Sequence, residues 1–472
     1  MPAPRTPAAG RDAADRDPTE QDPTGQDPTG PDPTGQDAVP GQGQEPGGER
    51  AAVLRASAAG LIAAFVGFSS SFAVVLEGLT KVGASHTEAA SGLMALCVAM
   101  GVCAIVLSLR SRLPISIAWS TPGAALLAGS TGTHGGFPAA VGAFLLTGVL
   151  VVLSGLWKPL GRWVSAIPTP LANAMLAGIL LPLCLAPAHA VKSDPAVGLG
   201  VVLTWAVVGS VRKLYAVPAA VVAAVVLIAT TTHIDTGTLG PMWPHPVLVA
   251  PHFTVAAAVG IALPLYVVTM ASQNIPGIAV LNVNGYRPDP GPLFGWTGVF
   301  SLLSAPFGGH AVNLAAITAA LCAGEEAGPD PRKRYRAAAV AGGAYILLGL
   351  GAAAAVAFVN ASPPNVIEAV AGLALLGALG NSLTGAMADA HHREPAVVTL
   401  VVTVSGVTFF GVSGAFWGLG AGGLLYALRY WQDTRRDRRA DRGEQALPAQ
   451  DVRRGRPWTC RSATRARAPA GR

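Results

Sequence analysis

Residues 110–127 read Arg110-Ser-Arg-Leu-Pro-Ile-Ser-Ile-Ala-Trp-Ser-Thr-Pro-Gly-Ala-Ala-Leu-Leu127 and lie inside a long apolar region. Up to Trp119, large apolar residues alternate with smaller ones at the period of a β-strand. Ser120 or Thr121 can cap a helix and Pro122 suits a first helical turn, so a helix is expected to follow. Extended backbone at membrane depth is tolerated only where protein or a water-filled cavity satisfies its polar groups. The stretch therefore predicts a cavity in the middle of the protein.

A second stretch in the other half of the chain repeats this arrangement. It reads Ser304-Ala-Pro-Phe-Gly-Gly-His-Ala-Val-Asn-Leu-Ala-Ala-Ile-Thr318. Two broken segments at corresponding places in two halves are the strongest sequence indication of a transporter's binding site. We therefore expect two half-helix N-termini to face each other, one near Thr121 to Gly123 and the other near Gly309 to Ala311.

The composition indicates an integral membrane protein. Of the 472 residues, 51% are hydrophobic and only 12% are charged, which is far from the composition of a soluble domain. The polar tract before Ala51 does not have the pattern of a cleavable signal peptide. The cysteines have no paired spacing, so neither a disulfide nor a metal site is expected; they are Cys97, Cys103, Cys184, Cys322 and Cys460.

The apolar runs define the expected domain organisation. Residues 1–50 carry a five-residue Asp-Pro-Thr repeat with few apolar side chains and are expected to be disordered. Fourteen apolar runs that can cross a bilayer follow, and an extracellular linker at 233–252 divides them into repeats at 51–232 and 253–430. Because seven is odd, the second repeat runs inverted. The sequence thus predicts an all-α polytopic membrane protein with a 7+7 inverted repeat, in which spans 3 and 10 are half extended and half helical.

Positive charges predict that both termini are cytoplasmic. With the N-terminus inside, cytoplasmic loops hold most of the Lys and Arg, including Arg332 to Arg336, whereas the outside loops hold chiefly Lys81 and Lys192. The tail at 431–472 is rich in arginine. Such a tail is compatible with nucleic-acid binding, but its place beside the last span favours a topological role with contact to anionic lipid. No nucleic-acid partner is expected.

Polar side chains at membrane depth mark the candidate site. Ser70 lies in a serine triplet of the first span, where serines often bond the preceding turn or let helices pack closely. Gln273 and Asn274 lie in the eighth span, which corresponds to the first. Two adjacent amides need several partners, which a hydrated ligand site supplies more readily than lipid does. We therefore expect both amides to donate hydrogen bonds to a ligand.

His310 is the ionisable side chain expected deepest in the protein. It is either a neutral imidazole bonded to a carbonyl or a proton site, since an intramembrane ionisable group is a functional hypothesis by default. Asn313, one turn on, is expected to face the same side and to orient His310 or the ligand. The sequence has no Cys-His, Ser-His-Asp, phosphate-loop or zinc spacing. Neither an enzyme nor a cofactor is therefore expected.

The chain from about Ala51 to Tyr430 resembles the benzoate/proton symporter family of bacterial membrane transporters. The shared motifs include Ala118-Trp-Ser-Thr-Pro-Gly-Ala-Ala-Leu126, Leu263-Pro-Leu-Tyr-Val-Val-Thr-Met-Ala-Ser-Gln-Asn-Ile-Pro-Gly-Ile278 and Ala415-Phe-Trp-Gly-Leu419. The resemblance implies proton-driven uptake of benzoate or a related aromatic carboxylate across the bacterial inner membrane by alternating access.

The same resemblance extends more distantly to nucleobase permeases and related anion transporters. Carboxylates in spans 8 and 10 of those permeases bind the base and couple protons. Here the similar positions are Gln273 or Asn274 and His310. Amides, a protonatable histidine and helix N-termini suit an anionic ligand, which a carboxylate would repel.

The expected ligand lies with its carboxylate between the two helix N-termini and its ring against aromatic side chains. The expected substrate-binding residues are Ser70, Trp119, Ser120, Thr121, Gly123, Gln273, Asn274, Phe307, Gly309, His310 and Asn313, with His310 carrying the proton. Three alternatives stay open: a permease for a nucleobase or another organic or inorganic anion, a facilitative pathway, and a non-transporting membrane sensor or scaffold. The sequence also leaves open whether the protein forms a homodimer.

Overall fold

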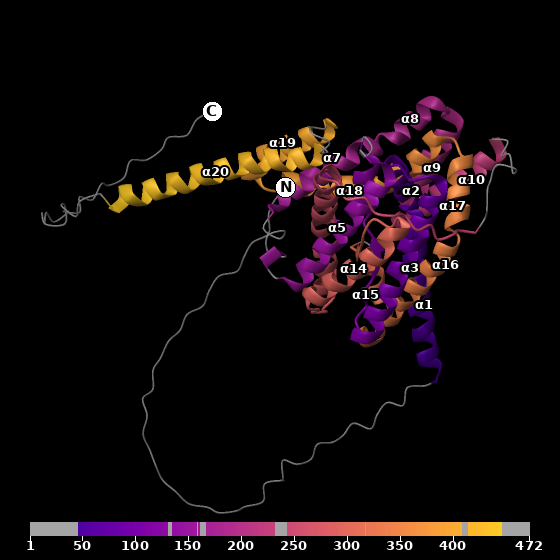
Figure 1. Cartoon of the computed structure of the whole chain (residues 1–472). Coiled ribbons are helices and arrows are strands. Elements are labelled where there is room, and N and C mark those ends of the chain that lie inside the picture. Colours follow the sequence, from indigo (N-terminus) through magenta and orange to yellow (C-terminus); the bar gives the residue numbers. More distant parts are fainter. Residues whose placement is uncertain are drawn as a thin grey trace, which may run out of the picture. The chain divides into compact units, whose positions relative to one another are not determined.

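The computed structural model describes residues 46–130, 135–157, 159–160, 167–231, 243–316, 318–407 and 414–445 (Figure 1). Most of these residues are helical, and one two-stranded sheet lies among the helices. The chain is an all-α polytopic membrane protein. The Asp-Pro-Thr repeats, residues 233–242 of the predicted linker and the tail beyond residue 445 lie outside the described residues.

The first half of the described chain extends to residue 231. Its elements are α1 (Pro46–Ser69), α2 (Phe72–Lys81), α3 (His86–Ser111), β1 (Ile117–Trp119), α4 (Thr121–Ala128), α5 (Gly136–Leu156), α7 (Thr169–Cys184), α8 (Ala186–Ser193), α9 (Pro195–Val211) and α10 (Lys213–Thr231).

The second half begins with a span in which α-helix and π-helix alternate: α11 (Val255–Ala257), η2 (Ala258–Ala262), α12 (Leu263–Thr269), η3 (Met270–Asn274) and α13 (Ile275–Val283). The elements around the second broken stretch are α14 (Pro290–Ser304), η4 (Ala305–Phe307), β2 (Val312–Leu314), α15 (Thr318–Ala323), η5 (Glu325–Ala327) and η6 (Pro331–Lys333). The remaining elements are α16 (Tyr335–Leu350), α17 (Ala352–Ala361), α18 (Pro364–Met387), η7 (Ala390–His392), α19 (Arg393–Val404) and α20 (Gly414–Gln445).

Several helices are long and apolar enough to cross a membrane. Within the described residues there are seven, and α16 with α17, bent by 55°, makes an eighth if the pair is one span. The seven are Arg50–Lys81, His86–Ser111, Gly136–Leu156, Thr169–Ser193, Lys213–Thr230, Val255–Val283 and Asn365–Met387. The fourteen crossings counted from the sequence include shorter segments, and that number stays a prediction.

The two broken stretches meet in the only sheet of the described chain. β1 pairs with β2 antiparallel, with Ile117 opposite Leu314. The ladder continues on either side, where the Ser120 N–H donates to the Ala311 carbonyl at 3.1 Å. Each strand thereby satisfies the backbone groups of the other, as extended chain at membrane depth requires. The predicted change from extended chain to helix is confirmed at both places.

The helix of the second stretch begins later than predicted. We expected its N-terminus near Gly309 to Ala311, but α15 begins at Thr318, so that prediction is wrong. Gly308 has a φ of +93°, which glycine adopts readily, and it turns the chain out of η4 toward the sheet. The residues that follow are held extended because their backbone groups bond β1.

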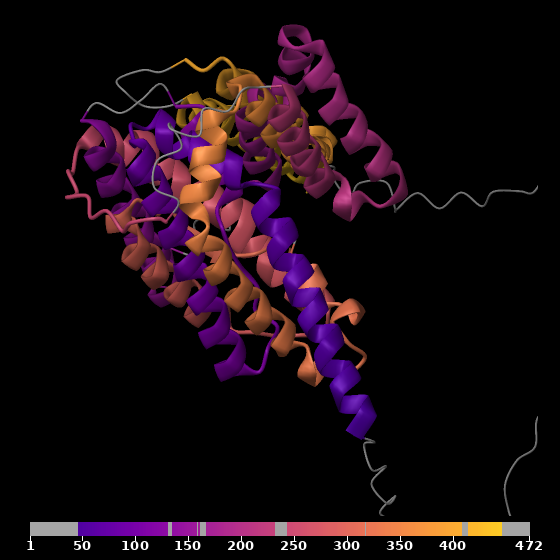
Figure 2. The ribbon, with the colours of Figure 1, turned by 90° about the vertical axis from the view of Figure 1, so that its right-hand side faces the viewer.

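Small residues bring the helices close together. α3 packs against α16, α5 against α14, and α7 against α18 and α19 (Figure 1). A Cβ on Gly101 of α3 would lie only 2.5 Å from the carbonyl oxygen of Gly342 of α16. Gly60 brings α1 equally close to α16, and the two helices run beside each other in Figure 2. Such close approach is how helices associate where lipid removes the hydrophobic driving force.

Candidate functional site

A cavity of about 60 Å³ lies where the two broken stretches meet. At about 10–15 Å³ for each water, it has room for roughly four to six water molecules. Its walls come from α1, the residues between α1 and α2, α3, β1, the start of α4, η3, the chain after β2, the start of α15, and α16. The polar side chains that line it are Ser70, Ser71, Thr121, Gln273, Thr318 and Tyr345.

The N-terminus of α4 lies at this cavity and is capped by Ser120. The Ser120 hydroxyl accepts from the Gly123 N–H at 3.1 Å and from the Thr269 hydroxyl at 2.8 Å. Pro122 has no N–H. In the first turn, the Thr121 N–H is therefore left without a partner among the described residues. This N–H lies at the positive end of an eight-residue helix, which favours an anion.

Trp119 forms an aromatic wall of the cavity and is held in place. Its indole N–H donates to the Ser71 hydroxyl at 2.9 Å. Phe68 contacts the indole edge-on with ring centroids 5.7 Å apart, and Tyr345 lies 6.4 Å away on another side. Ser70 and Ser71 each donate to the Gly67 carbonyl at 3.1 Å, at the point where α1 breaks before α2. The serine triplet thus shapes the break and also contributes to the cavity.

Two prolines shape the span that carries the amides. A proline cannot bond the carbonyl four residues earlier, because it has no N–H. Just before Pro264 the helix widens into the π-helix η2, and just before Pro276 it widens into η3. π-Turns of this kind are frequent at functional sites. Gln273 and Asn274 both belong to η3.

The two adjacent amides have different surroundings. Gln273 is 9% exposed and lines the cavity, and its amide has no hydrogen bond with any described residue. Asn274 is fully buried, and its Oδ1 accepts from the Leu314 N–H at 2.9 Å. Its Nδ2 donates to the Met270 sulfur at 3.2 Å. The Asn274 amide therefore fastens η3 to β2, whereas the Gln273 amide is free for a ligand.

His310 lies just before β2 and is not among the residues that line the cavity. It is fully buried, and its Nε2 lies 3.0 Å from the Ser120 carbonyl oxygen. Because a carbonyl oxygen only accepts, Nε2 carries the hydrogen. Nδ1 has no partner among the described residues, and neither has Oδ1 of the buried Asn313. The ring of Phe144 meets the imidazole edge-on with centroids 6.4 Å apart.

Four other predicted site residues also lie outside the lining. Ser120 and Gly123 form the cap of α4. Gly309 packs against α14, where an added Cβ would lie 2.6 Å from the Ser304 hydroxyl oxygen. Phe307 lines a separate apolar groove of about 280 Å³ between α3 and α14. Of the eleven predicted residues, the cavity is lined by Ser70, Trp119, Thr121 and Gln273.

The sequence reasoning missed Tyr345, Thr318 and Gly67 as lining residues. A tyrosine hydroxyl in the middle of the apolar run at 335–350 is a signal of the same kind as Gln273. Thr318 was recognised only as part of the second broken stretch. Gly67 gives no signal in the sequence, because its role depends on the Tyr345 hydroxyl that faces it.

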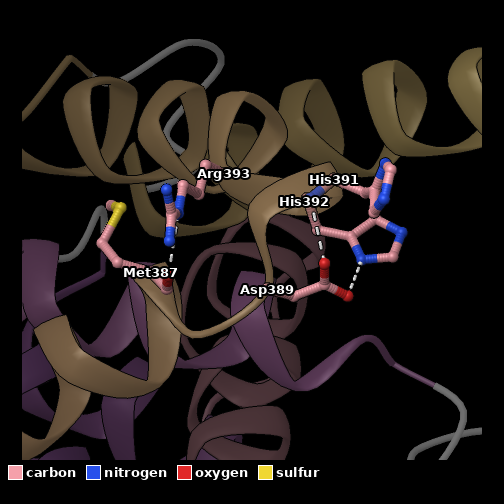
Figure 3. Close-up of polar contacts among 5 residues, drawn as sticks. All are labelled: Met387, Asp389, His391, His392 and Arg393. Carbon is pink, nitrogen blue, oxygen red and sulfur yellow. Dashed lines mark hydrogen bonds and ion pairs between the residues drawn. The ribbon is translucent and has the colours of Figure 1, made fainter. Parts of the chain in front are cut away.

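The residues of the Asp389 cluster lie between α18 and α19 (Figure 3), and none of them lines the cavity. The Asp389 carboxylate accepts from the His391 N–H at 2.9 Å and bonds the His392 ring at 2.5 Å. The hydrogen bond from His392 holds the pKa of the partly exposed Asp389 below its usual value. Arg393 donates to the Met387 carbonyl at 3.0 Å and so ends α18. These contacts close the turn between α18 and α19.

A comparison with known families identifies the chain. The sequence profile described as benzoate membrane transport protein matches residues 51–428. The chain belongs to this family. The match covers both broken stretches and η3, so the cavity is built from residues of the family domain.

Two relatives show how far the family resemblance extends. The inner membrane protein YdcO of Escherichia coli (strain K12) is 40% identical over 371 residues, which cover 78% of this chain and 94% of that protein. The benzoate membrane transport protein of Acinetobacter baylyi (strain ATCC 33305 / BD413 / ADP1) is 31% identical over 375 residues, which cover 79% of this chain and 95% of that protein. Membership of this family supports a membrane transporter.

Solved structures of anion transporters share the fold at low sequence identity. SLC26A9 superposes with a TM-score of 0.56 at 13% identity over 80% of this chain, which spans 65% of that protein's length. The transmembrane domain of the cyanobacterial bicarbonate transporter BicA gives a TM-score of 0.51 at 16% identity, covering 79% of this chain and 97% of that domain. At these identities the likeness concerns the fold alone.

Proposed function

We propose that this protein is a secondary active transporter that imports benzoate or a related aromatic carboxylate together with protons. One observation carries the proposal: the unpartnered Gln273 amide lines a cavity that also receives the N-terminus of α4. An amide N–H and the unpaired Thr121 N–H suit a carboxylate. The Trp119 indole offers an aromatic face to a ring.

In this proposal the two halves of the chain form a 7+7 inverted repeat of fourteen spans, with both termini in the cytoplasm of a bacterial cell. An inverted relation matches predicted span 2 (88–109, α3) with span 9 (292–304, α14) and span 4 (137–157, α5) with span 11 (335–359, α16 and α17). The pair α3–α16 therefore corresponds to the pair α14–α5. The close packing of both pairs supports this relation. The antiparallel pairing of β1 with β2 supports it as well, since the relation exchanges the two strands.

The location of the cavity supports transport by alternating access. All residues that line it belong to predicted spans 1–4 and 8–11. One body made of these spans would carry the ligand as it rocks against the body made of spans 5–7 and 12–14. The substrate site then moves as a unit, and exposure alternates between the two sides of the membrane.

Uptake into proteoliposomes tests the transport proposal. With an imposed inward proton gradient, labelled benzoate should accumulate, and a protonophore should abolish the accumulation. In a panel of unlabelled nucleobases, bicarbonate and substituted benzoates, only the aromatic carboxylates should compete with labelled benzoate. Competition by nucleobases or bicarbonate alone would favour a permease of different specificity on the same fold. Accumulation that persists with the protonophore, or no transport of any compound, would overturn the proposal.

The proposed proton carrier is His310, whose Nδ1 is unpartnered and buried. A His310→Gln variant keeps a side-chain donor for the Ser120 carbonyl but cannot take up a proton near neutral pH. We expect this variant to lose acid-stimulated uptake and to retain exchange of labelled for unlabelled ligand. Uptake that keeps the parent's pH dependence would remove His310 from coupling.

A further inference from the structure

A second cavity, of about 300 Å³, lies between α2, the start of α3, α17 and α18. Part of its lining is apolar, with Leu76 from α2, Val359 from α17 and Ile367 from α18. The rest of its lining includes charged and titratable side chains: Glu77 and Lys81 of α2, His86 of α3 and Glu368 of α18. An apolar wall beside charged groups suits an amphiphilic ligand, such as a ring that carries a carboxylate.

The second cavity lies next to the central cavity along the first span. Ser71 lines the central cavity and Ala73 lines the second one. Between them stands Phe72, which is 6% exposed and stacks on Phe68 with ring centroids 5.4 Å apart. Phe68 in turn contacts Trp119 of the central cavity. A stack of aromatic rings therefore lies at the break between α1 and α2, where the chain passes from the lining of one cavity to the lining of the other.

The charges of the second cavity oppose an anion until a proton binds. Glu77 and Glu368 come from opposite walls, and neither carboxylate has a hydrogen bond or ion pair with a described residue. Together with Lys81, one turn after Glu77, two ionised carboxylates leave one net negative charge. One bound proton makes these three groups neutral, and His86 adds a positive charge whenever it is protonated. α17 contributes no charged side chain to the lining.

We propose that the second cavity is an access site for the transported anion, and that it admits the anion only when the pair Glu77 and Glu368 holds one bound proton. This proposal rests on the proposed transport function. The ligand's carboxylate then pairs with Lys81, its ring lies on the apolar wall, and displacement of Phe72 opens the way to the central cavity. The second cavity includes α18, so it spans the two bodies that would rock against each other. Proton and anion therefore enter together at the interface that moves.

Two single substitutions test the charge requirement. Either Glu77→Gln or Glu368→Gln leaves one carboxylate together with Lys81. The charges of these two groups then balance without a bound proton. In proteoliposomes with equal pH on both sides, exchange of labelled for unlabelled ligand, which does not require His310, should fall about tenfold or more in the parent as the pH is raised and the carboxylate pair loses its bound proton. Each variant should show a nearly flat profile at the parent's acid rate. Glu326→Gln is the matched control, since Glu326 is exposed on η5 and does not line the second cavity, and it should keep the parent profile.

A labelling experiment tests the same requirement without transport. In a Val359→Cys background, an anionic methanethiosulfonate should react at neutral pH about fivefold faster once Glu368→Gln is added. The rate of an uncharged methanethiosulfonate should not change, and the background without Val359→Cys corrects for native cysteines. Equal anionic rates with and without Glu368→Gln would overturn the access site whatever the outcome of the uptake assay. Faster anionic labelling without any uptake of aromatic acids would support the site and contradict the proposed function instead.

Discussion

Uptake of an aromatic carboxylate should be abolished when Gln273 is replaced by Glu. The substitution keeps the size of the side chain but places a carboxylate in the cavity beside the N-terminus of α4. An uncompensated like charge at a buried site costs several kcal/mol, so we expect a loss of at least about a hundredfold in kcat/KM. The measurement is initial uptake of labelled benzoate, normalised to the amount of protein in the membrane.

Two companion variants define what the Gln273 amide contributes. Gln273→Ala removes a hydrogen bond to a charged group and should lower kcat/KM about tenfold to a hundredfold. Asn282→Ala is the control, because Asn282 lies on the same span beyond the cavity and its side chain has no hydrogen bond with a described residue. Uptake by Gln273→Glu at the parent rate would show that the carboxylate binds elsewhere.

Replacement of Gly67 by Ala should also strongly reduce transport. An added Cβ would lie 2.1 Å from the Tyr345 hydroxyl oxygen and 3.2 Å from Cγ2 of Thr318, so the Tyr345 ring, or the helix that carries it, must shift. Overpacking of this kind costs about 1–3 kcal/mol, and here the displaced atoms line the cavity. We expect at least a tenfold loss of uptake and a lower melting temperature.

A second-site substitution separates this clash from a general loss of folding. Tyr345→Phe removes the hydroxyl that the new Cβ meets, so the double variant Gly67→Ala/Tyr345→Phe should regain part of the lost stability. Gly343→Ala on α16, the helix that carries Tyr345, is the control, since nothing lies within 4 Å of its added Cβ. No recovery in the double variant, or an equal defect in Gly343→Ala, would contradict the packing argument.

The sequence predicted the two broken stretches because their cause is local. Alternating apolar residues, a capping serine and a proline at the first helical turn all act within residues 115–123, and the structure has β1 and α4 there. The start of α15 could not be predicted in the same way. Residues 311–315 are extended because of hydrogen bonds to β1, and register across a sheet is a tertiary property.

The candidate site shows a similar division between local and tertiary causes. Gln273 and Asn274 stand out in the sequence as amides at membrane depth, but the sequence treats them alike. The widened turn before Pro276 decides which amide faces the cavity and which bonds Leu314. His310 likewise stands out by its chemistry, whereas its bond to the Ser120 carbonyl depends on the pairing of the strands.

The pairing of β1 with β2 also has a consequence for how the protein is made. During synthesis, β1 reaches the membrane well before its partner, since residues as close as Ser120 and His310 are 190 positions apart in the chain. Until β2 arrives, the backbone groups of β1 have no ladder to join, and lipid cannot satisfy them. The first half alone is therefore an incomplete folding unit, which quality-control proteases should degrade. Co-expression of separate halves should rescue it only if the second half supplies its strand.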